Sequence, residues 1–429
     1  MIYYKYMMNL ITDVIQRQPI ILSILLIGFM LVLLYLTIRK FLTWRRYKFL
    51  TEKNSWALLE IIIPQEIRRS PEAMELFFMN TIWWEKGTSS NKIKKYWKGE
   101  TRMDFSFEIV SLGGSIHFFI HAPTHLIDLT KSQLYAQYPQ IELRSVLDYT
   151  DRIPAYVRDH LGIAMFSWEY GFKKPGAYPI RTYRDWGTDR TMQLDLDEQI
   201  DPMAAMIEKL ASIDPWEEFW VQIGVRIEKD EAWRAEGEAI IDKIITGHRR
   251  VVPGTEEMGQ RTPMISTLTK GEQEVVDAID RQTGHMHAFE VAIRSVFLTR
   301  RPEQFNANRI GFLKGLFEPF NSHSLNSFKS VNPTGFDNPW EDYNEYLENM
   351  LKDRALERYR QREFFGEKPV TFNIWDAFLR MLGSYTPKTL IMTGEELATL
   401  FHLPAGFTQS PSVKRTDTKK AQPPSNLPL

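Results

Sequence analysis

Two neighbouring stretches of the chain alternate strictly between apolar and polar residues. Their apolar positions are Met103, Phe105, Phe107 and Ile109, then Ile116, Phe118 and Ile120. A period of two residues is typical of a strand with one buried face. Gly113-Gly114 separates the stretches, and paired glycines suit the tight turn of a hairpin. The pattern predicts a hairpin in which Leu112 faces Ser115 and Ser106 faces His121.

Further strand and helix patterns flank this hairpin. An apolar run over residues 56–63 predicts a strand, and Ser70-Pro71-Glu72 has the capping hydroxyl, first-turn proline and acid of a helix start. A second helix is predicted from Pro123 to about Gln137, and a fourth strand over Ile141–Val146. The order strand, helix, strand, strand, helix, strand predicts a ferredoxin-like unit (βαββαβ) over residues 56–150, within an α+β fold.

The same order of patterns recurs later in the chain. We predict a second ferredoxin-like unit over residues 177–332, with its first strand at Tyr178–Trp186, a helix starting at Asp201-Pro202 and its last strand at Leu325–Val331. A helical insert over residues 229–285 interrupts this unit. The insert's predicted helices lie near Trp233–Ile244 and Thr269–Arg281.

The C-terminal part has two different patterns. Residues 341–402 are predicted to be a helical region that begins with a charged amphipathic helix, which is usually a solvated surface helix. Residues 403–429 are rich in proline and lysine and lack apolar periodicity. This tail is therefore expected to be an extended linker or a docking strand.

The N-terminal part contains the longest uncharged apolar run, residues 20–38. As a helix the run would be roughly 28 Å long, close to the thickness of a hydrocarbon core. Basic residues are concentrated after it, in the linker over residues 39–55. The positive-inside rule then predicts a single-pass anchor with residues 1–19 outside and the bulk of the chain in the cytoplasm. A cleaved signal peptide is the alternative, but its apolar region is shorter and its charge comes first.

Composition limits the remaining possibilities. The chain of 429 residues has 53 basic and 54 acidic side chains, so it is not a globally basic nucleic-acid binder. It has no cysteine, which excludes disulfides, thiolate metal sites and cysteine nucleophiles. Hydrophobic residues make up 43% and charged residues 25%, which is an ordinary globular balance and excludes a mostly disordered chain.

Histidines of the predicted hairpin are the best candidates for metal binding. His117 and His121 would share one face of a strand, and Glu108 would lie diagonally across from His121, so a His₂Glu site is conceivable. His125 lies past a proline, at a helix start. His285 and His287 form a second, weaker pair. A partly exposed polar sheet face is the commoner explanation of such residues, and we assign no metal ligand.

Other catalytic patterns are missing from the sequence. It contains no Walker A loop, GxGxxG, GxSxG or HExxH motif. Glu217-Glu218 and Glu395-Glu396 are adjacent carboxylates, and adjacent residues in regular structure point apart, so neither pair is expected to be an acid–base dyad. We therefore predict no catalytic residue, no cofactor and no enzymatic activity. Two alternatives stay open. Four-stranded sheets also occur in proteins that bind single-stranded nucleic acid, here as a component of a DNA transfer channel, and a His/Glu site on the first sheet would make the protein a metal-dependent enzyme.

Several segments together resemble a known kind of protein. They are Ser70–Phe78 (SPEAMELFF), Phe105–Ser111, Tyr135–Pro139, Asp337–Trp340, Thr393–Pro404 (TGEELATLFHLP) and Pro423–Pro428. They resemble the membrane-anchored, uncharacterised region that precedes the FtsK/HerA/TraG-type ATPase domain in type IV secretion or conjugation-like proteins of small-genome, uncultured bacteria of the candidate phyla radiation. The resemblance runs from about Trp56 to the end.

The resemblance implies a role in a larger machine. In such proteins the nucleotide-binding domain follows the last of these motifs, whereas the present sequence ends at Leu429. We therefore expect a non-enzymatic scaffold or adaptor at the bacterial plasma membrane that docks a separately encoded ATPase of a type IV secretion-like or pilus-like machine. A homo-oligomer is compatible with this role, and contact with nucleic acid would be indirect.

Overall fold

The computed structural model describes most of the chain, in two compact units. The described residues are 22–38, 41–42, 44–45, 55–64, 69–82, 103–154, 162–187, 201–228, 231–247, 268–284, 287–305, 307–336, 342, 345–365, 388–404 and 415–416. The first unit comprises Met1–Lys53, Thr88–Thr101 and Glu367–Pro369, and the second comprises the rest.

The first unit contains a helix over residues 22–38, which corrects the predicted membrane anchor. These 17 residues are all exposed. Among the described residues, no helix combines the length and the apolar character that a membrane crossing requires. The single-pass anchor, and the plasma-membrane location that depends on it, are therefore wrong.

The second unit is built on one large antiparallel sheet, and its first half confirms the predicted hairpin. The elements of this half are β1 (Trp56–Pro64), α2 (Glu72–Thr81), β2 (Phe105–Leu112), β3 (Ser115–Pro123), α3 (Ile127–Gln137) and β4 (Glu142–Val146). The strand order is β4-β1-β3-β2, with every neighbouring pair antiparallel. Leu112 pairs with Ser115 and Ser106 with His121, as the two-residue glycine turn predicts.

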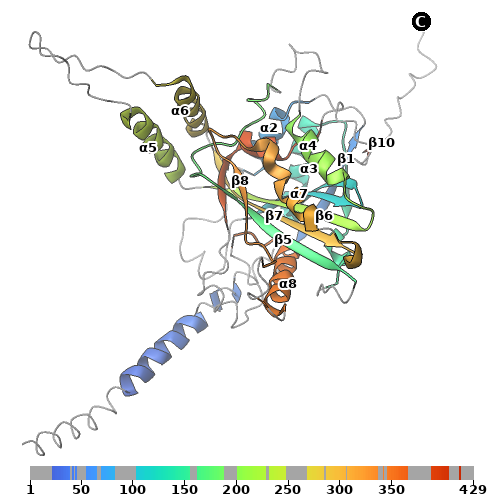
Figure 1. The fold of residues 1–429 in the computed structure, drawn as a ribbon, viewed down its shortest axis with the longest axis vertical. Coiled ribbons are helices and arrows are strands. Elements are labelled where there is room, and N and C mark those ends of the chain that lie inside the picture. Colours follow the sequence, from blue (N-terminus) through green and yellow to red (C-terminus); the bar gives the residue numbers. More distant parts are fainter. Residues whose placement is uncertain are drawn as a thin grey trace, which may run out of the picture. The chain divides into compact units, whose positions relative to one another are not determined.

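The second half repeats this connectivity and joins the first edge to edge. Its elements are β5 (Ala164–Phe172), α4 (Pro202–Ala211), β6 (Glu217–Ile227), β7 (Ala288–Thr299), α7 (Ala307–Lys314) with the 3-10 helix η8 (Gly315–Phe320), and β8 (Phe328–Val331). The order is β6-β7-β5-β8, again antiparallel. Strand β2 pairs with β6, so one continuous sheet crosses the unit (Figure 1).

The first strand of the second half lies earlier than predicted. Residues 178–186 form turns, and the strand is β5, Ala164–Phe172. Most β5 residues are buried on both faces of the sheet. Its sequence nevertheless alternates, with Phe166, Trp168 and Tyr170 separated by polar Ser167 and Glu169, so the pattern of a strand was present here and the prediction overlooked it. The predicted insert contains α5 (Ala232–Gly247) and α6 (Lys270–Thr283), close to the predicted helices.

The C-terminal part adds to both faces and to the edges of the sheet. Helix α8 (Tyr346–Arg360) is followed by strand β9 (Leu390–Thr393), helix α10 (Gly394–Leu400) and the two-residue strand β10 (Arg415–Thr416). Strand β9 pairs with β7, and β10 pairs in parallel with the end of β1. The region over residues 341–402, predicted to be helical, thus contains the helices α8 and α10 and also the strand β9, which the prediction did not include.

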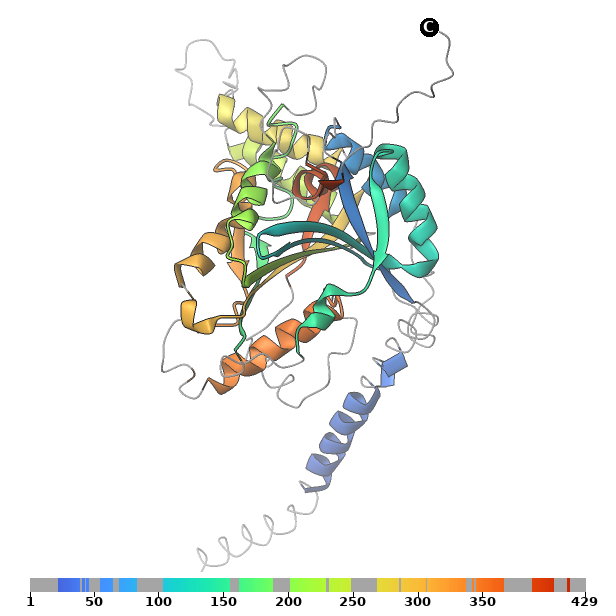
Figure 2. The same ribbon diagram turned by 90° about the vertical axis from the view of Figure 1, so that its right-hand side faces the viewer.

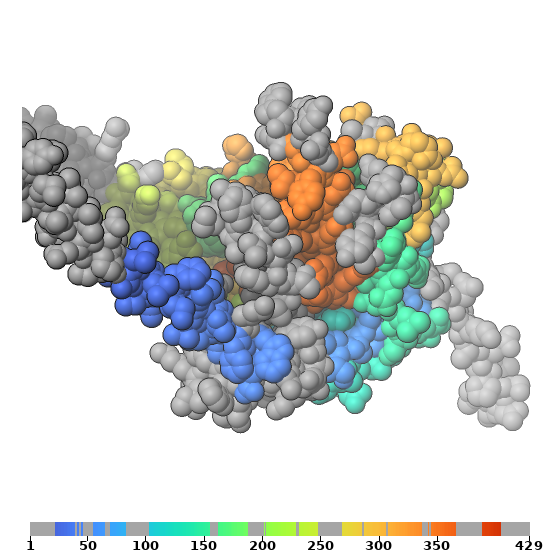
Figure 3. Space-filling model, turned by 90° about the horizontal axis from the view of Figure 1, so that it is seen from below, coloured from blue at the N-terminus to red at the C-terminus, as the bar shows by residue number. Residues whose placement is uncertain are grey.

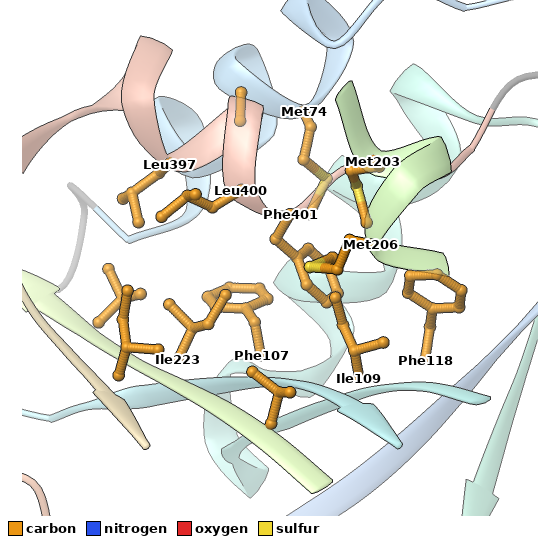
Figure 4. Close-up of a cluster of buried hydrophobic side chains, with 14 of the residues drawn as sticks. Met74, Phe107, Ile109, Phe118, Met203, Met206, Ile223, Leu397, Leu400 and Phe401 are labelled. Atoms are coloured by element: carbon orange, nitrogen blue, oxygen red, sulfur yellow. The ribbon is translucent and has the colours of Figure 1, made fainter. Parts of the chain in front are cut away.

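Two layers cover the sheet, one on each face (Figure 2). The major face, which carries Phe107, Phe118 and Ile223, packs against α2, α3, α4, α7 and α10 in the main hydrophobic core. Figure 4 shows Met74 of α2, Met203 of α4 and Phe401, which directly follows α10, meeting the sheet residues Phe107, Ile109 and Phe118. The minor face, which carries Glu108 and Trp220, packs against α8 and the 3-10 helix η4 (Tyr149–Arg152).

Candidate functional site

The histidines singled out for metal binding do not converge. The Nδ1 atom of His117 lies 2.8 Å from Oε1 of Glu60, while the His121 ring stacks on Trp56 with centroids 5.0 Å apart. His125 is exposed at the start of α3. Within the described ranges, no group of three or more histidine, aspartate or glutamate side chains has the geometry to hold a metal ion. His285 lies outside those ranges.

A row of polar side chains instead crosses the minor face. The strand registers align Glu108 of β2, Gln222 of β6, Arg294 of β7 and Glu169 of β5. Gln222 Nε2 donates to Glu108 at 3.1 Å, and Arg294 Nη2 donates to Glu169 at 3.3 Å. Each of these side chains is buried. A buried polar row is stable only if other segments supply its remaining hydrogen bonds.

Arg362, just after α8, supplies the balancing charge. Its Nε and Nη2 atoms donate to the two oxygens of Glu108 at 3.0 and 3.2 Å, a bidentate pair. The same guanidinium binds Asp148, which follows β4. Arg362 has φ of 46°, in the left-handed region that non-glycine residues rarely adopt. The backbone is therefore strained at Arg362, the residue whose guanidinium binds Glu108.

Two tyrosines complete this network. Tyr149 donates to Glu108 Oε2 at 2.7 Å, and its hydroxyl lies 2.8 Å from that of Tyr359. Burial, and then the charge of Glu108, raise the pKa of both tyrosines well above the usual range. Burial opposes the ionisation of Asp148. The hydrogen bond and the positive charge of Arg362 outweigh this effect of burial, so the pKa of Asp148 is lowered. The group thus holds paired opposite charges beside neutral phenols.

The residues after Arg362 close the network over the sheet. The backbone oxygen of Glu363 accepts a hydrogen bond of 2.9 Å from Arg294. Phe364 packs directly on Gly224, where any Cβ would overlap the aromatic ring, so only glycine leaves room for it. The guanidinium of Arg226, paired with Glu290 at 2.7 Å, lies 4.0 Å from the centroid of the Phe365 ring. We call residues 359–365 the strap.

The strap occupies the surface that the nucleic-acid alternative would require. Base stacking needs exposed aromatic side chains on an open sheet face. On the minor face, Phe119 and Trp220 are buried beneath Tyr149 and Tyr359, with ring centroids 5.1 and 5.3 Å apart. Figure 3 shows α8, coloured orange, forming part of the outer surface on this side. These aromatic side chains serve packing.

A second polar cluster lies on the major face, around the start of α10. Glu396 closes a capping box with Thr393, whose backbone N–H donates to Oε2 at 2.9 Å. The same carboxylate accepts from the backbone of Ile180 at 3.0 Å and from Gln282 Nε2 at 2.7 Å. One side chain therefore joins β9, the 173–187 loop and α6.

No arginine or lysine side chain hydrogen-bonds to Glu396 among the described residues. Burial raises its pKa to about 7, and the charge of Glu395 adds to this shift, although hydrogen bonds from Thr393 and Ile180 oppose it. A carboxyl group with this pKa changes its charge near neutral pH. Such groups occur at catalytic sites and also in structural networks.

The neighbouring Glu395 has other partners. It accepts from the Thr182 hydroxyl and lies 3.3 Å from Arg184 Nε and 3.6 Å from Arg281 Nη2. Arg184 also lies 3.6 Å from Glu75 of α2. The two adjacent carboxylates therefore bind different partners in separate directions. Their arrangement holds four elements together and does not form an acid–base dyad.

The rest of the Thr393–Pro404 segment is also internal. Thr399 Oγ1 accepts from the backbone N–H of Tyr183 at 2.9 Å, and His402 Nε2 lies 3.1 Å from Oδ1 of Asp201. Asp201 also caps α4, at the predicted helix start. All residues from 393 to 404 are buried. The segment behaves as a plug in the major-face core.

Sequence reasoning identified only part of these two clusters. It named Glu108 as a possible metal ligand and overlooked Asp148 and Arg362. No local signal connects Arg362 to Glu108, because 254 positions separate them. Glu396 had a usable signal, since Thr393 and Glu396 have the spacing of a capping box.

Comparisons with known proteins place the chain in a family. No curated protein matches it. The sequence model of one family, described as a domain of unknown function (DUF8128), matches residues 88–416. That match includes β2 to β10, both polar clusters and the plug. The chain therefore belongs to the DUF8128 domain family.

Proposed function

We propose that this protein is a non-enzymatic adaptor that docks a separately encoded ATPase of the FtsK/HerA/TraG class, in a machine related to type IV secretion, conjugation or pili. The partner class comes from the resemblance carried by segments such as Thr393–Pro404. The observation that carries the adaptor role is the use of this motif: its carboxylates, hydroxyls and histidine form internal bonds that unite distant segments. The motif therefore builds a rigid body rather than a reaction centre.

We also infer that each half of the sheet is a ferredoxin-like unit. The orders β4-β1-β3-β2 and β8-β5-β7-β6 follow the same connectivity of two split βαβ motifs. Joining two such units through β2 and β6 protects two sheet edges from solvent. The product is a wide, two-sided platform on which further segments can be displayed.

A co-expression experiment tests the adaptor role. The chain is produced together with the FtsK/HerA/TraG-type ATPase encoded nearest to it, and the mixture is separated by size exclusion with light scattering. We expect a stoichiometric complex, and an ATPase rate that comes from the partner alone. A chain that elutes separately while the ATPase assembles normally would contradict the proposal, as would turnover of nucleotide by the chain itself.

A further inference from the structure

The helical hairpin α5–α6 is firmly attached at one end. At this base, Gln282 binds Glu396 at 2.7 Å, and Arg281 binds Asp185 at 3.1 Å. Gly237 of α5 lies against Ile279 and Thr283 of α6, where a Cβ would overlap Thr283. The base is therefore part of the rigid unit, and Figure 1 shows the two helices side by side and extending away from the sheet.

The distal half of the hairpin buries its apolar residues poorly. On α5, Ile241 is half-buried and Ile245 is 39% exposed, while Val276 of α6 is half-buried. Their helical positions place them on the same side of the hairpin, opposite to the buried Ala278 and Gln282. Two helices alone cannot enclose the seam between them, and a third helix normally completes it.

Acidic side chains border this seam on both helices. Glu238 and Asp242 have the i, i+3, i+4, i+7 spacing with Ile241 and Ile245, which places all four on one face of α5. On α6, Asp280 lies one turn after Val276, at i+4, and Asp277 lies next to Val276 and one turn before Asp280. All four carboxylate residues are exposed. Across α5 and α6 there are seven acidic and four basic residues, so the arm is net negative.

We propose that this acidic seam is a docking site for a basic amphipathic helix of a partner protein. The apolar face of such a helix would cover Ile241, Ile245 and Val276, and its lysines or arginines would meet the four carboxylates. A second copy of the hairpin would bring like charges together, which disfavours self-association. The proposal rests on the adaptor role and names the surface and the partner chemistry.

Matched synthetic peptides provide the test with the full chain. One amphipathic peptide has leucines on one face and lysines on the other, and its twin has glutamates in place of the lysines. We expect only the lysine peptide to bind, to protect α5 and α6 from hydrogen exchange, and to weaken as salt rises. The double variant Asp242→Lys, Asp277→Lys should lose at least about threefold in affinity and gain binding of the glutamate peptide.

A charge reversal elsewhere on the same helix is the control. Glu236 is exposed on α5 but lies away from the seam, so Glu236→Lys should leave the affinity nearly unchanged. Equal binding of both peptides, no protection of the hairpin, or concentration-dependent dimerisation that Ile245→Glu abolishes would each overturn the proposal. If the ATPase complex forms but the lysine peptide does not bind, the docking surface on the hairpin is wrong and the adaptor role stands. If the peptide binds but no ATPase complex forms, the proposed ATPase partner is wrong.

Discussion

The two faces of the sheet bury charge in different ways. On the minor face, Arg362 is shared between Glu108 and Asp148, so negative groups meet a guanidinium that stays charged. On the major face, the hydrogen bonds that Glu396 accepts from described residues all come from neutral donors, on Thr393, Ile180 and Gln282. In the minor-face cluster, negative charge is paired with positive charge. In the major-face cluster, burial opposes the ionisation of the Glu396 carboxyl group. The same sheet therefore combines a joint that is insensitive to pH near neutrality with one that is sensitive.

The difference also concerns which segments each cluster holds. The minor-face network binds the strap, residues 359–365, to the middle of the sheet. The major-face cluster binds the plug and the base of the α5–α6 hairpin. Breaking one cluster should release the strap, and breaking the other should loosen the hairpin, so the two can be separated by experiment.

The largest effect is expected from Arg362→Ala. It leaves Glu108 and Asp148 buried or partly buried without their shared cation, and breaking a buried ion pair in this way costs about 3–5 kcal/mol. Chemical denaturation should show this loss in the free energy of unfolding. Arg144→Ala is the matched control, because its pair with Glu142 is exposed to solvent and its loss should leave stability nearly unchanged.

A second variant distinguishes the loss of the charge at Arg362 from the loss of its packing contacts. Arg362→Met combined with Glu108→Gln removes both ionised groups of the central pair and keeps similar volume. We expect it to recover part of the stability lost in Arg362→Ala, because no carboxylate at position 108 is then left uncompensated. If Arg362→Ala were as mild as Arg144→Ala, the minor-face network would not be the joint described here.

Next in size is the pH dependence contributed by Glu396. Its pKa is raised from 4.5 to about 7 in the folded protein. The folded state therefore keeps a proton that the unfolded state releases in this window, and stability falls as pH rises through it. Between pH 5 and 8 this amounts to roughly 2–3 kcal/mol. Denaturation at several pH values should show the slope, and Glu396→Gln should flatten it.

Asp148 on the minor face serves as the comparison for the pH dependence attributed to Glu396. The pKa of Asp148 is lowered in the folded protein, from 3.8 in the unfolded chain. Its contribution to the free energy of unfolding is therefore fully present above pH 3.8 and is lost only as the pH falls below that value. It should therefore add almost nothing between pH 5 and 8. A wild-type profile that is flat over this range, or a slope that survives in Glu396→Gln, would remove Glu396 as the sensitive group.

Gly224→Ala should have an intermediate effect and act on the strap. The new Cβ would overlap the Phe364 ring, and overpacking of this kind costs about 1–3 kcal/mol. Gly171→Ala is the control within another strand, because its Cβ would meet Val331 at an ordinary distance of 3.6 Å. In a Phe364→Ala background the Gly224→Ala change should become much milder, which thermal unfolding can measure. A cost that persists there would mean that Phe364 is not the obstacle.

The sequence revealed the fold best where one face of a strand alternates. The β2–β3 hairpin and its register followed from alternation and two glycines, because a two-residue turn leaves only one pairing. Strand β5 was missed although Phe166, Trp168 and Tyr170 alternate with polar Ser167 and Glu169, so that signal was overlooked rather than absent. Strand β9 has only four residues, too few to show a period. The apolar run at residues 20–38 was interpreted as a span from its hydropathy and the basic residues after it, whereas no helix among the described residues is both long and apolar enough to cross a membrane.

The candidate clusters were harder to predict than the strands. Glu108 lies within a clear strand, but its partners Asp148, Tyr149 and Arg362 come from segments that the sequence does not align with it. Contacts of this kind depend on how the covering layer closes over the sheet, which no local pattern encodes. Glu396 is the exception, because a capping box is a short-range signal.

The smallest effect is expected from Thr269→Ala, which tests how far the major-face cluster stabilises α6. Thr269 caps the distal end of α6 through a capping box with Glu272, while Gln282 anchors the other end to Glu396. Loss of the cap should cost about 1 kcal/mol locally, because backbone donors of the first turn lose their acceptor. Hydrogen exchange should accelerate in the first turn of α6 and stay unchanged near Gln282, with little change in global stability. Thr246→Ala on α5 is the matched control, because its hydroxyl donates to the backbone of its own helix, at Asp242, and does not cap a helix start. If exchange instead accelerated along the whole of α6, the anchor at Glu396 would not hold the base of the hairpin independently of its tip.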